Sequence, residues 1–418
     1  MSMRAVTDEG KRMDQDIMII GAGPAGLSFA RLMADSGLTV AIVDRQSIAR
    51  IAGPMFDGRD IALTHQSVRI LDEIGAWDRI GPNRRSAIRA ARVLDGASPY
   101  TLDFTPRRAA TDVLGYLVSN HVIRSALYDE VRNLENVTFV TDASVTDVRT
   151  SDNGATVFLE DGRALTSLLV IAADSRYSET RRIVGIPAEM QDFGRVCIVC
   201  RAAIEKSHDG VAYECFHYGR TLAILPLVGN LVSVVITAPM DQRGTIMDMD
   251  EQAFNADLRA RFGERLGRVE LTTERFAYPL VGVHARRFRA RRFALVGDAA
   301  VGMHPVTAHG YNLGLSGAEI LAGAVIDASR RGADIGSDGV LARYESRHMR
   351  KTRPLYHGTN EIVRLFTDDR LPAKLARQAI LRISNNVPPL KGIIRHLLTQ
   401  PGRAQLPVPP LPLQPGDR

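Results

Sequence analysis

Residues 16–44, DIMIIGAGPAGLSFARLMADSGLTVAIVD, decide the fold of this chain. The apolar run IMII predicts a buried parallel strand that ends in a glycine-rich turn, and a helix and a second strand ending at Asp44 follow. Gly21 permits the tight turn, Gly23 lets the backbone approach a pyrophosphate, and Gly26 lets the helix pack on the strand. Asp44 is placed to accept a hydrogen bond from a ribose. This order of elements predicts a bound dinucleotide rather than an unliganded turn.

The length and composition are those of a folded protein with more than one packed unit. The chain has 418 residues, 45% of them hydrophobic and 24% charged, so two or three units with a substantial core are expected. Its 53 basic and 47 acidic residues give a net charge of +6 and a pI near 9.4. This balance suits a phosphate-bearing cofactor, an anionic membrane surface or an ordinary solvated face. Because no basic run is interleaved with aromatic residues, nucleic acid is not an expected partner.

The cysteines and the apolar stretches indicate where the protein works. Cys197, Cys200 and Cys215 suit a reducing compartment without a disulfide framework. The CxxC pair lies in a β-like run without a second pair or a nearby histidine, so buried strand thiols are expected rather than a metal site. The N-terminal segment lacks the apolar core of a signal peptide. The longest apolar stretch, residues 221–239, is interrupted by Pro226 and predicts a hairpin, so a cytoplasmic protein is expected.

The order of strand and helix patterns predicts an α/β fold. A Rossmann-like nucleotide domain with a largely parallel sheet is expected to hold an inserted β-rich domain, with helices at the C-terminus. Periodicity predicts a helix capped by Thr64 and helices over 122–134, 250–262 and 312–329. The nucleotide domain is assigned residues 14–80, 104–187 and 281–345, the inserted domain residues 81–103 and 188–280, the C-terminal helical region residues 346–400, and a Pro-rich tail residues 401–418.

A second glycine-rich stretch, GDAAVGMHPVTAHGYNLGL, occupies residues 297–315. The apolar strand before it places Asp298 at the carboxyl edge of the sheet, where an acid can bond a polyol hydroxyl. Gly310 permits close approach of the backbone to a ligand. The helix expected from Asn312 points its positive end at the same place, an arrangement that stabilises an anionic ring system.

Three blocks together resemble the class A flavoprotein aromatic hydroxylases of the para-hydroxybenzoate hydroxylase fold: GAGPAG with Asp44, LVIAAD ending at Asp174, and GDAA with Pro305, Gly310 and Asn312. The stretches GRDIALTHQSVRILDEIGAW, LAILPL, YPL and HPVTAHGYNLGL are similar to the ubiquinone-biosynthesis hydroxylases of the UbiH, UbiI, UbiF and UbiM type, and GDAAVGMHPVTAHG is most similar to the UbiM type. The resemblance covers most of the chain. It implies an FAD domain with an inserted substrate domain, FAD as cofactor, and NADPH or NADH as co-substrate.

The resemblance also implies roles for individual residues where the motifs match. Asp44 resembles the ribose ligand of FAD, Asp298 the ribityl ligand, and residues 305–312 the loop along the flavin ring. Arg59 and Arg124 resemble arginines near the flavin and the pyrophosphate, with an ordinary surface arginine as the alternative for each. The expected cofactor-binding residues are Gly21, Gly23, Ala25, Gly26, Asp44, Arg45, Arg59, Arg124, Asp174, Gly297, Asp298, Pro305, Gly310, Tyr311 and Asn312.

Two departures from the family pattern bear on the chemistry. The family's Asp-Gly motif reads Asp174-Ser175 here, so a side chain stands where the family has none, and this bears on nicotinamide contact. Val301 and His309 replace a histidine and a glutamine that lie over the flavin in the family. His309 and Pro305 are the catalytic candidates, His309 for bonding a substrate hydroxyl or tuning its ionisation, with an ordinary loop histidine as the alternative. Because the loop histidines have no evident third ligand, no metal is assigned.

The implied activity is hydroxylation of the aromatic ring of a polyprenylated ubiquinone precursor, of the demethoxyubiquinol type, with NAD(P)H and O2. A hydroxylase of a soluble phenolic metabolite and a flavin-binding scaffold of a quinone-biosynthesis complex stay open as alternatives. Residues 374–400 combine apolar and basic side chains, so they are expected either to lie on the inner face of an anionic membrane or to pack on the FAD domain or a partner protein. A prenylated quinol, the membrane and other ubiquinone-biosynthesis proteins are the expected partners.

Overall fold

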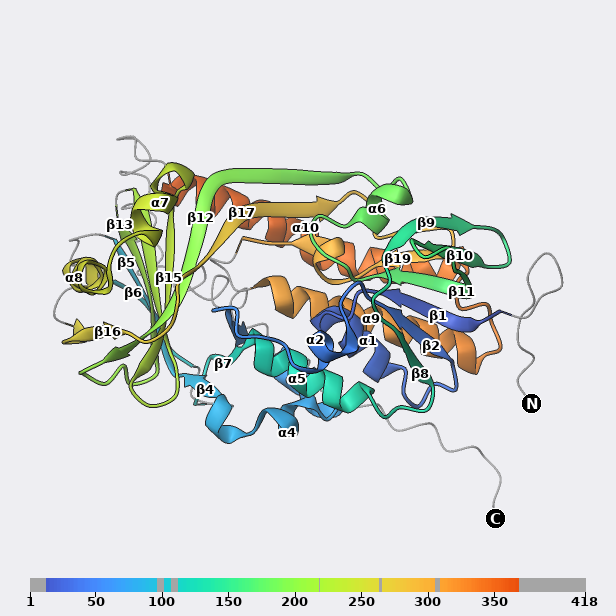
Figure 1. The fold of residues 1–418 in the computed structure, drawn as a ribbon, viewed down its shortest axis with the longest axis horizontal. Coiled ribbons are helices and arrows are strands. Elements are labelled where there is room, and N and C mark those ends of the chain that lie inside the picture. The colour runs from blue at the N-terminus through green and yellow to red at the C-terminus, as the bar shows by residue number, and fades with distance from the viewer. Residues whose placement is uncertain are drawn as a thin grey trace, which may run out of the picture.

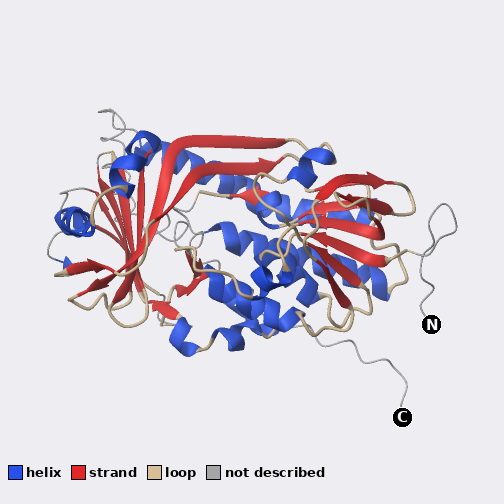
Figure 2. Cartoon of the chain, viewed as in Figure 1, coloured by secondary structure: helices blue, strands red, loops and turns tan. Residues whose placement is uncertain are grey.

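The computed structural model describes residues 13–95, 101–106, 112–217, 219–262, 265–304 and 309–367. They form two sheet-based parts joined by two long strands, β12 (Ala188–Ile204) and β17 (Phe276–Ala285) (Figure 1). Helices gather beside the first sheet, whereas strands dominate the second part (Figure 2). The α/β class with a β-rich second part, expected from the sequence, is therefore confirmed.

The first sheet consists of the apolar strands that flank the glycine-rich turns. Its strands are β1 (Gln15–Ile20), β2 (Val40–Val43), β8 (Val137–Val140), β9 (Val145–Thr150), β10 (Ala155–Leu159), β11 (Ala164–Ala172), β18 (Arg289–Ala290) and β19 (Phe293–Leu295). The strand order is β18, β19, β11, β1, β2, β8. Neighbouring strands from β19 to β8 pair in parallel. Ile17, Met18 and Ile19 of β1 are fully buried because both faces of the sheet are covered.

Helices cover this sheet and lie along its carboxyl edge. The long helices α9 (His309–Arg330) and α10 (Asp338–Thr367) pack against each other, and α1 (Pro24–Leu32) packs against both α5 (Asn120–Val131) and α9. The shorter described helices are α2 (Ile48–Ala52), α3 (His65–Glu73), α4 (Ala76–Ile80), α6 (Glu179–Ile183), α7 (Arg243–Met247) and α8 (Glu251–Phe262), with the 3-10 turns η1 (Pro82–Arg84), η2 (Met240–Gln242) and η4 (Gly297–Ala299).

The two faces of the second sheet carry two different buried clusters of side chains. Its strands are β5 (Ala90–Asp95), β6 (Thr101–Phe104), β12, β13 (Val211–His217), β14 (Arg220–Pro226), β15 (Leu231–Pro239), β16 (Val269–Leu271), β17 and β20 (Val301–Gly302). Cys200 belongs to the buried cluster beneath α8, whereas Cys197 belongs to a cluster on the opposite face. Both thiols are buried, so the expectation of buried strand cysteines is confirmed.

A small sheet links the two parts. It consists of β3 (Asp60–Leu63), β4 (Ser86–Ile88) and β7 (Gly115–Ser119). Arg201 of β12 reaches this sheet, where its Nη2 lies 2.6 Å from Asp60 Oδ1 and donates to Ser119 Oγ. Its guanidinium also lies 4.6 Å from the centre of the Phe56 ring. Because the Asp60 side chain is completely buried, this ion pair fixes β12 against the small sheet.

Two further local expectations are confirmed. Thr64 caps α3, since its hydroxyl accepts a hydrogen bond from the backbone N–H of Ser67. The apolar stretch 221–239 forms the antiparallel pair β14 and β15, as its interruption by Pro226 predicted. Among the described residues, every helix is too short or too polar to cross a bilayer.

Two expected helices have different bounds in the structure. The helix expected over 122–134 begins at Asn120, whose amide donates to Asp57 Oδ2 (2.8 Å) and anchors its first turn, and it ends at Val131. The helix expected from Asn312 begins three residues earlier, at His309. The side chains of His309 and Asn312 are both buried, one helical turn apart. In the expected C-terminal helical region, α10 continues through Pro354 to Thr367, and residues 368–400 and the Pro-rich tail lie outside the described residues.

Candidate active site

Four segments reach the carboxyl edge of the first sheet. The neighbouring strands β19, β11, β1 and β2 lead to Asp298, Asp174, Gly21 and Asp44, in that spatial order. Parallel pairing therefore aligns motifs from opposite ends of the chain along one edge. Asp44 and Asp298 are separated by three strand spacings, about 14 Å. The edge is long enough to hold an extended dinucleotide along its length.

The first glycine-rich turn is closed toward the sheet and open toward solvent. Gly21 has φ +110°, and a Cβ there would lie 2.6 Å from Ala173 O. A Cβ on Gly26 would lie 2.0 Å from Gly21 O, so only glycine lets α1 sit against the turn. At Gly23 the nearest atom would be 3.9 Å away, and no side chain caps the N-terminus of α1. The free N–H groups of α1 and the space at Gly23 suit a pyrophosphate.

The acid after β2 is held by the backbone. Asp44 Oδ2 accepts from Ala22 N (2.6 Å), and Asp44 Oδ1 accepts from Gln46 N (2.7 Å). Each carboxylate oxygen still has capacity to accept from a ribose hydroxyl. The neighbouring Arg45 is exposed. Asp44 is thus fixed beside the glycine-rich turn, whereas Arg45 has the freedom of a surface side chain.

Arg59 and Arg124 approach the edge from the loop before β3 and from α5. Arg59 Nη2 lies 2.6 Å from Asp57 Oδ2. Burial works to lower the pKa of Arg59, but the hydrogen bond and charge of Asp57 raise it above its usual value. Arg124 is half-buried and makes no hydrogen bond or ion pair in the described part of the chain. Burial and the charge of Arg59 lower the pKa of Arg124, and the charges of Asp57 and Asp44 offset this only in part, so an anion beside this guanidinium would stabilise it.

The segment after β11 contains an arginine that the sequence analysis did not assign. Arg176 Nη2 lies 2.9 Å from Asp298 Oδ2, and its Nη1 donates to Val281 O (3.1 Å). Asp174 Oδ2 accepts from the Thr180 hydroxyl (3.2 Å), while Asp174 Oδ1 is buried without a partner among the described residues. Asp298 is therefore held in place across the edge.

The second glycine-rich turn packs directly on the first. Gly297 has φ +63°, and a Cβ there would lie 2.7 Å from Ala25 Cβ. A Cβ on Gly314 of α9 would lie 3.1 Å from Gly297 Cα, so α9 also touches this turn. Tyr311 lies against Ser28 of α1, and burial raises its pKa. These contacts bring the start of α9 beside the start of α1.

The first turn of α9 is partly occupied by contacts within the protein. Asn312 Oδ1 accepts from Thr64 N (3.0 Å) and Ser67 Oγ (2.6 Å), and its amide donates to Ala62 O (2.8 Å). Its side chain therefore ties α9 to β3 and α3. At Gly310, by contrast, a Cβ would meet no atom within 4 Å.

The histidines of this loop are both buried. His304 packs edge-on against Phe193 with ring centres 5.0 Å apart, and burial near Arg195 and Arg176 lowers its pKa to about 4. His309 is 2% exposed at the start of α9 rather than on an irregular loop. Pro305, the other catalytic candidate, lies outside the described residues.

An apolar surface of the second sheet faces this edge. We call it the apolar wall; it consists of Cys197, Val199 and Leu280, with Phe193, Val235, Phe276 and Tyr278 packed against them. Tyr278 Oη donates to Asp57 O (2.6 Å), and the guanidinium of Arg59 lies 5.5 Å from the centre of the Tyr278 ring. Tyr278 therefore connects the apolar wall to the arginines at the edge of the first sheet.

Comparison with known proteins agrees with this geometry. The FAD binding domain family matches residues 14–353. The chain is 48% identical to ubiquinone hydroxylase UbiM of Neisseria meningitidis over 93% of its length and 85% of that protein, and 35% identical to ubiquinone hydroxylase UbiL of Rhodospirillum rubrum over 92% and 89%. The chain belongs to this family of FAD-binding hydroxylases. The family expected from the sequence motifs, including similarity to UbiM, is confirmed.

A solved structure shows the same fold. The p-nitrophenol 4-monooxygenase PnpA of Pseudomonas putida superposes with a TM-score of 0.74 at 20% identity, covering 92% of this chain and 98% of that one. Family membership makes FAD the cofactor, and NAD(P)H is the co-substrate typical of the family. The cofactor expectation is therefore confirmed.

The residues of this FAD-binding chain fit the cofactor. The open space at Gly23 and the uncapped start of α1 are shaped for a pyrophosphate, and the half-buried Arg124 needs an anion beside it. Asp44 and Asp298 stand at opposite ends of the same edge with acceptor capacity for hydroxyl groups. Each of these features is explained by a bound FAD.

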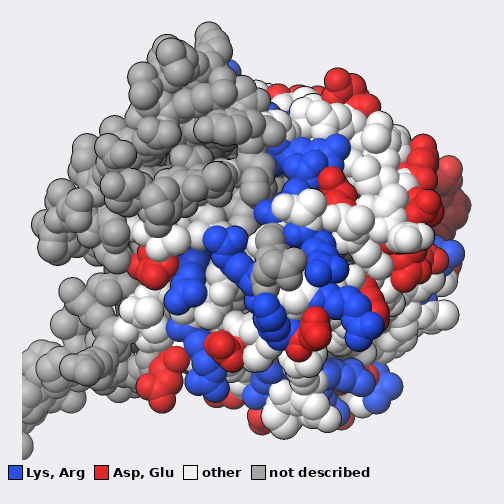
Figure 3. All heavy atoms as spheres, turned by 90° about the vertical axis from the view of Figure 1, so that its left-hand side faces the viewer, with Lys and Arg blue, Asp and Glu red and all other residues white. Residues whose placement is uncertain are grey.

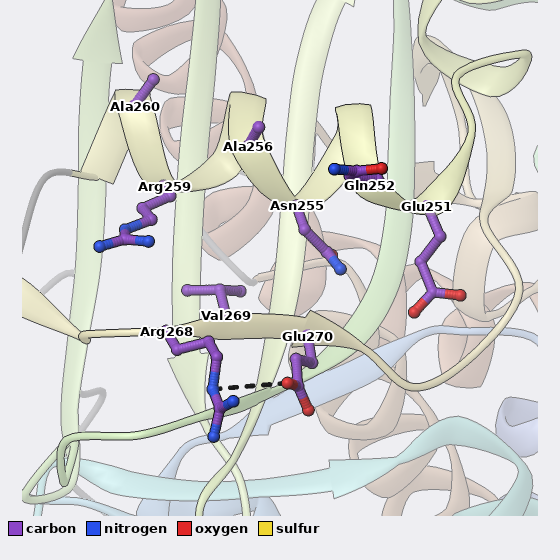
Figure 4. A pocket seen from close by; sticks show the side chains of 9 residues that line it. All are labelled: Glu251, Gln252, Asn255, Ala256, Arg259, Ala260, Arg268, Val269 and Glu270. Carbon is purple, nitrogen blue, oxygen red and sulfur yellow. Dashed lines mark ion pairs between the residues drawn. The ribbon is translucent and has the colours of Figure 1, made fainter.

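A separate groove lies far from this edge. It runs between α8 and β16 and is lined by Glu251, Gln252, Asn255, Ala256, Arg259, Ala260, Arg268, Val269 and Glu270 (Figure 4). Arg268 and Glu270 form an ion pair across 3.4 Å within it. Because the groove lies at the far end of the second sheet, away from the edge with the glycine-rich turns, it has no part in holding FAD (Figure 1).

Proposed function

We propose that the protein is an FAD-dependent monooxygenase that hydroxylates the aromatic ring of a polyprenylated ubiquinone precursor, using NAD(P)H and O2. The observation that carries this proposal is the 48% identity to ubiquinone hydroxylase UbiM across 93% of the chain. The geometry agrees, because an apolar wall lies opposite the FAD edge and suits the ring of an apolar substrate.

Position along the edge supports the proposed residue roles. Bound FAD supplies the electrons and activates the oxygen that is transferred. The chain's own residues hold the cofactor: the N-terminus of α1 and Arg124 bind the pyrophosphate, Asp44 the ribose and Asp298 the ribityl chain. The other residues assigned to the cofactor are Gly21, Gly23, Ala25, Gly26, Arg45, Arg59, Asp174, Gly297, Gly310, Tyr311 and Asn312.

Water exclusion and substrate contact fall to the second sheet and the start of α9. The apolar wall keeps water away from the reacting ring, which the oxygen transfer requires. His309 is the proposed contact to a substrate hydroxyl. His304 stays neutral near neutral pH because its pKa is lowered to about 4, so it adds no charge to the site.

We also propose that the protein touches the membrane surface that holds such a lipid and works beside other proteins of ubiquinone biosynthesis. Lys and Arg side chains gather at the end of the molecule formed by the second sheet (Figure 3). Several are partly neutralised there, as Arg220 and Arg261 are by Asp257. Sedimentation with anionic and with neutral vesicles tests this contact. Binding to the anionic vesicles is expected, and a protein that sediments with neither vesicle type would contradict the proposal.

The direct test of the function is complementation. The chain is expressed in a bacterium without its own ubiquinone ring hydroxylases, and the quinone lipids are measured by mass spectrometry. Asp298→Ala removes the proposed ribityl ligand, and Glu270→Gln, which changes an exposed side chain of β16, is the control. We expect the wild type and Glu270→Gln to restore ubiquinone and Asp298→Ala to fail.

The alternatives predict other results. A hydroxylase of a soluble phenol would leave the prenylated precursors unchanged, although NADPH would reduce the purified yellow protein. A flavin-binding scaffold would bind FAD but show no substrate-stimulated reduction by NAD(P)H. Either result contradicts hydroxylation of a prenylated precursor.

A further inference from the structure

One acid on the second sheet has no role in the site described above. Glu214 lies on β13 between Tyr213 and Cys215. Cys215 belongs to the buried cluster beneath α8, and the Tyr213 ring packs edge-on against Phe262 of α8 with centres 5.2 Å apart. Because side chains alternate along a strand, Glu214 points to the opposite face, toward the FAD edge.

Strand register places Glu214 on the same face as the apolar wall. Glu214 pairs with Ala223 of β14, Ala223 with Val235 of β15, and Val235 with Val199 of β12. Residues paired directly across antiparallel strands share a face, so this row leads from Glu214 into the apolar wall. Glu214 also interacts electrostatically with the thiol of Cys197 in that wall. Glu214 is therefore a polar group at the border of the apolar wall.

The surroundings of Glu214 give it no partner. In the described part of the chain it makes no hydrogen bond and no ion pair, and burial raises its pKa to about 8. Its cross-strand neighbours on this face are Val93 and Ala223. Glu214 acts electrostatically on the thiols of Cys197 and Cys215, and burial raises the pKa of each thiol to about 12, so both are uncharged. Arg176 also acts on Cys197 from the first sheet edge.

Glu214 is half-buried, so its carboxyl group lies beside apolar side chains and stays accessible to a ligand. The FAD assigned to the first sheet edge has its own acids, Asp44 and Asp298, and needs none on β13. A ligand that lies on the apolar wall and carries one hydroxyl supplies what Glu214 lacks. A phenol has both properties, since its ring is apolar and its O–H group is a donor.

We propose that Glu214 binds the ring hydroxyl of a phenolic substrate and accepts its proton. This inference rests on the proposed function and adds a catalytic residue to it. The O–H bond of the phenol breaks, a new O–H bond forms on the Glu214 carboxylate, and the electron pair stays on the phenolate oxygen. The phenolate donates electron density to its ring, which makes the ring carbon a better acceptor of the transferred oxygen.

Two variants separate binding from proton transfer. Glu214→Gln keeps a hydrogen-bonding group but cannot take the proton, and Glu214→Leu removes both. Glu270→Gln, in the same part of the molecule but exposed on β16, is the matched control. The probes are a geranyl-substituted phenol and its methyl ether, added to the FAD-loaded protein. Binding is measured from the flavin absorbance, and product by mass spectrometry as a function of pH.

The expected results differ between the variants. The wild type and the control bind the phenol on the order of tenfold more tightly than the ether, and Glu214→Leu loses most of this preference, with His309 as the remaining proposed contact to the hydroxyl. Glu214→Gln keeps much of the preference but forms product on the order of 100-fold more slowly. Its rate also loses the rise with pH that the wild type shows as Glu214 ionises near its pKa of about 8.

Failure of this inference is distinguishable from failure of the proposed function. If Glu214→Leu keeps the full preference for the phenol, or Glu214→Gln keeps the wild-type rate and pH profile, Glu214 is not the base. If the wild type forms no product, but binds the phenol more tightly than the ether and Glu214→Leu loses this preference, the prenylated substrate is wrong. Binding of the ring hydroxyl by Glu214 then stands. Melting temperatures of the FAD-free proteins check that the variants fold, and if Glu214→Leu does not, Glu214→Gln decides.

Discussion

The carboxyl edge of the first sheet and the face of the second sheet contribute to one site in different ways. At the edge, backbone geometry dominates: a Cβ on Gly21 or Gly26 would lie only 2.6 or 2.0 Å from a backbone oxygen, so neither position accepts a side chain. On the second sheet, side chains dominate, and they come from alternate positions of strands that are distant in sequence. The difference teaches that substitutions at the edge act on the cofactor through the backbone, whereas substitutions on the sheet face act on the substrate through side-chain chemistry.

The largest effect is expected from a methyl group in the first glycine-rich turn. Gly26→Ala places a Cβ 2.0 Å from Gly21 O, so α1 must move, at a cost of about 4 kcal/mol or more. We expect little folded protein and no bound FAD, measured by the ratio of flavin to protein absorbance. Gly23→Ala should fold but lose FAD, because the space it fills belongs to the cofactor. Equal FAD content in both variants and the wild type would show that backbone shape does not set this edge.

The link between the two parts gives the next effect. Arg201→Ala leaves Asp60 buried without its charge partner, so the free energy of unfolding should fall by about 3–5 kcal/mol. Denaturant unfolding measures this change. Arg268→Ala breaks the exposed pair with Glu270 and should cost less than about 1 kcal/mol. Similar losses in the two variants would mean that the Arg201 pair does not join the parts.

Arg124 sharpens the contrast between cofactor binding and folding. Arg124→Ala removes a half-buried guanidinium without a partner in the described chain, so the stability of the FAD-free protein should hardly change. Loss of a charge-assisted bond to the pyrophosphate should raise the Kd for FAD about 10- to 100-fold. FAD titration of the stripped protein measures it. An unchanged Kd would return Arg124 to the status of an ordinary surface arginine.

Acid should weaken the contact of β17 with α9 and α10. Burial lowers the pKa of His284 to about 4 and that of His348 to about 3, from an ordinary value of 6.5. The unfolded chain therefore binds more protons than the folded chain below pH 6.5, and stability falls as pH decreases from there toward these values. Each histidine should cost about 1 kcal/mol by one pH unit below 6.5. In melting curves, His348→Leu should lose about a third of the acid sensitivity, because the buried His304, with its pKa lowered to about 4, contributes alongside His284, and undiminished sensitivity would contradict the role of His348.

The cofactor edge could be predicted because its signals are local. Gly21, Gly23 and Gly26 with Asp44 lie within one short stretch, and Asp298 directly follows its own strand. The strand order then brings these stretches together without further information. The sequence predicts the start of α9 three residues too late, because a glycine in the first turn is typical of a loop.

The substrate half could not be predicted in the same way. Arg176 is significant only because it bonds Asp298, and Arg201 only because it reaches the buried Asp60. Glu214 stands in the run VAYECFH as an ordinary charged residue of a strand, and its isolation depends on register across four strands. Pairing between strands that are distant in the sequence produces no motif with a fixed residue spacing. The CxxC pair shows the converse, because its spacing suggests a site while the strand sends its thiols to opposite faces.

One measurement tests the central claim most directly. The purified FAD-loaded protein is given NADPH, oxygen gas enriched in a heavy isotope, and a short-chain prenylated ubiquinone precursor, and the product is analysed by mass spectrometry. We expect one labelled oxygen atom in the ring for each NADPH oxidised, and loss of this coupling in Asp298→Ala. Oxidation of NADPH without label in the ring would contradict the assignment of the protein as a hydroxylase of this substrate.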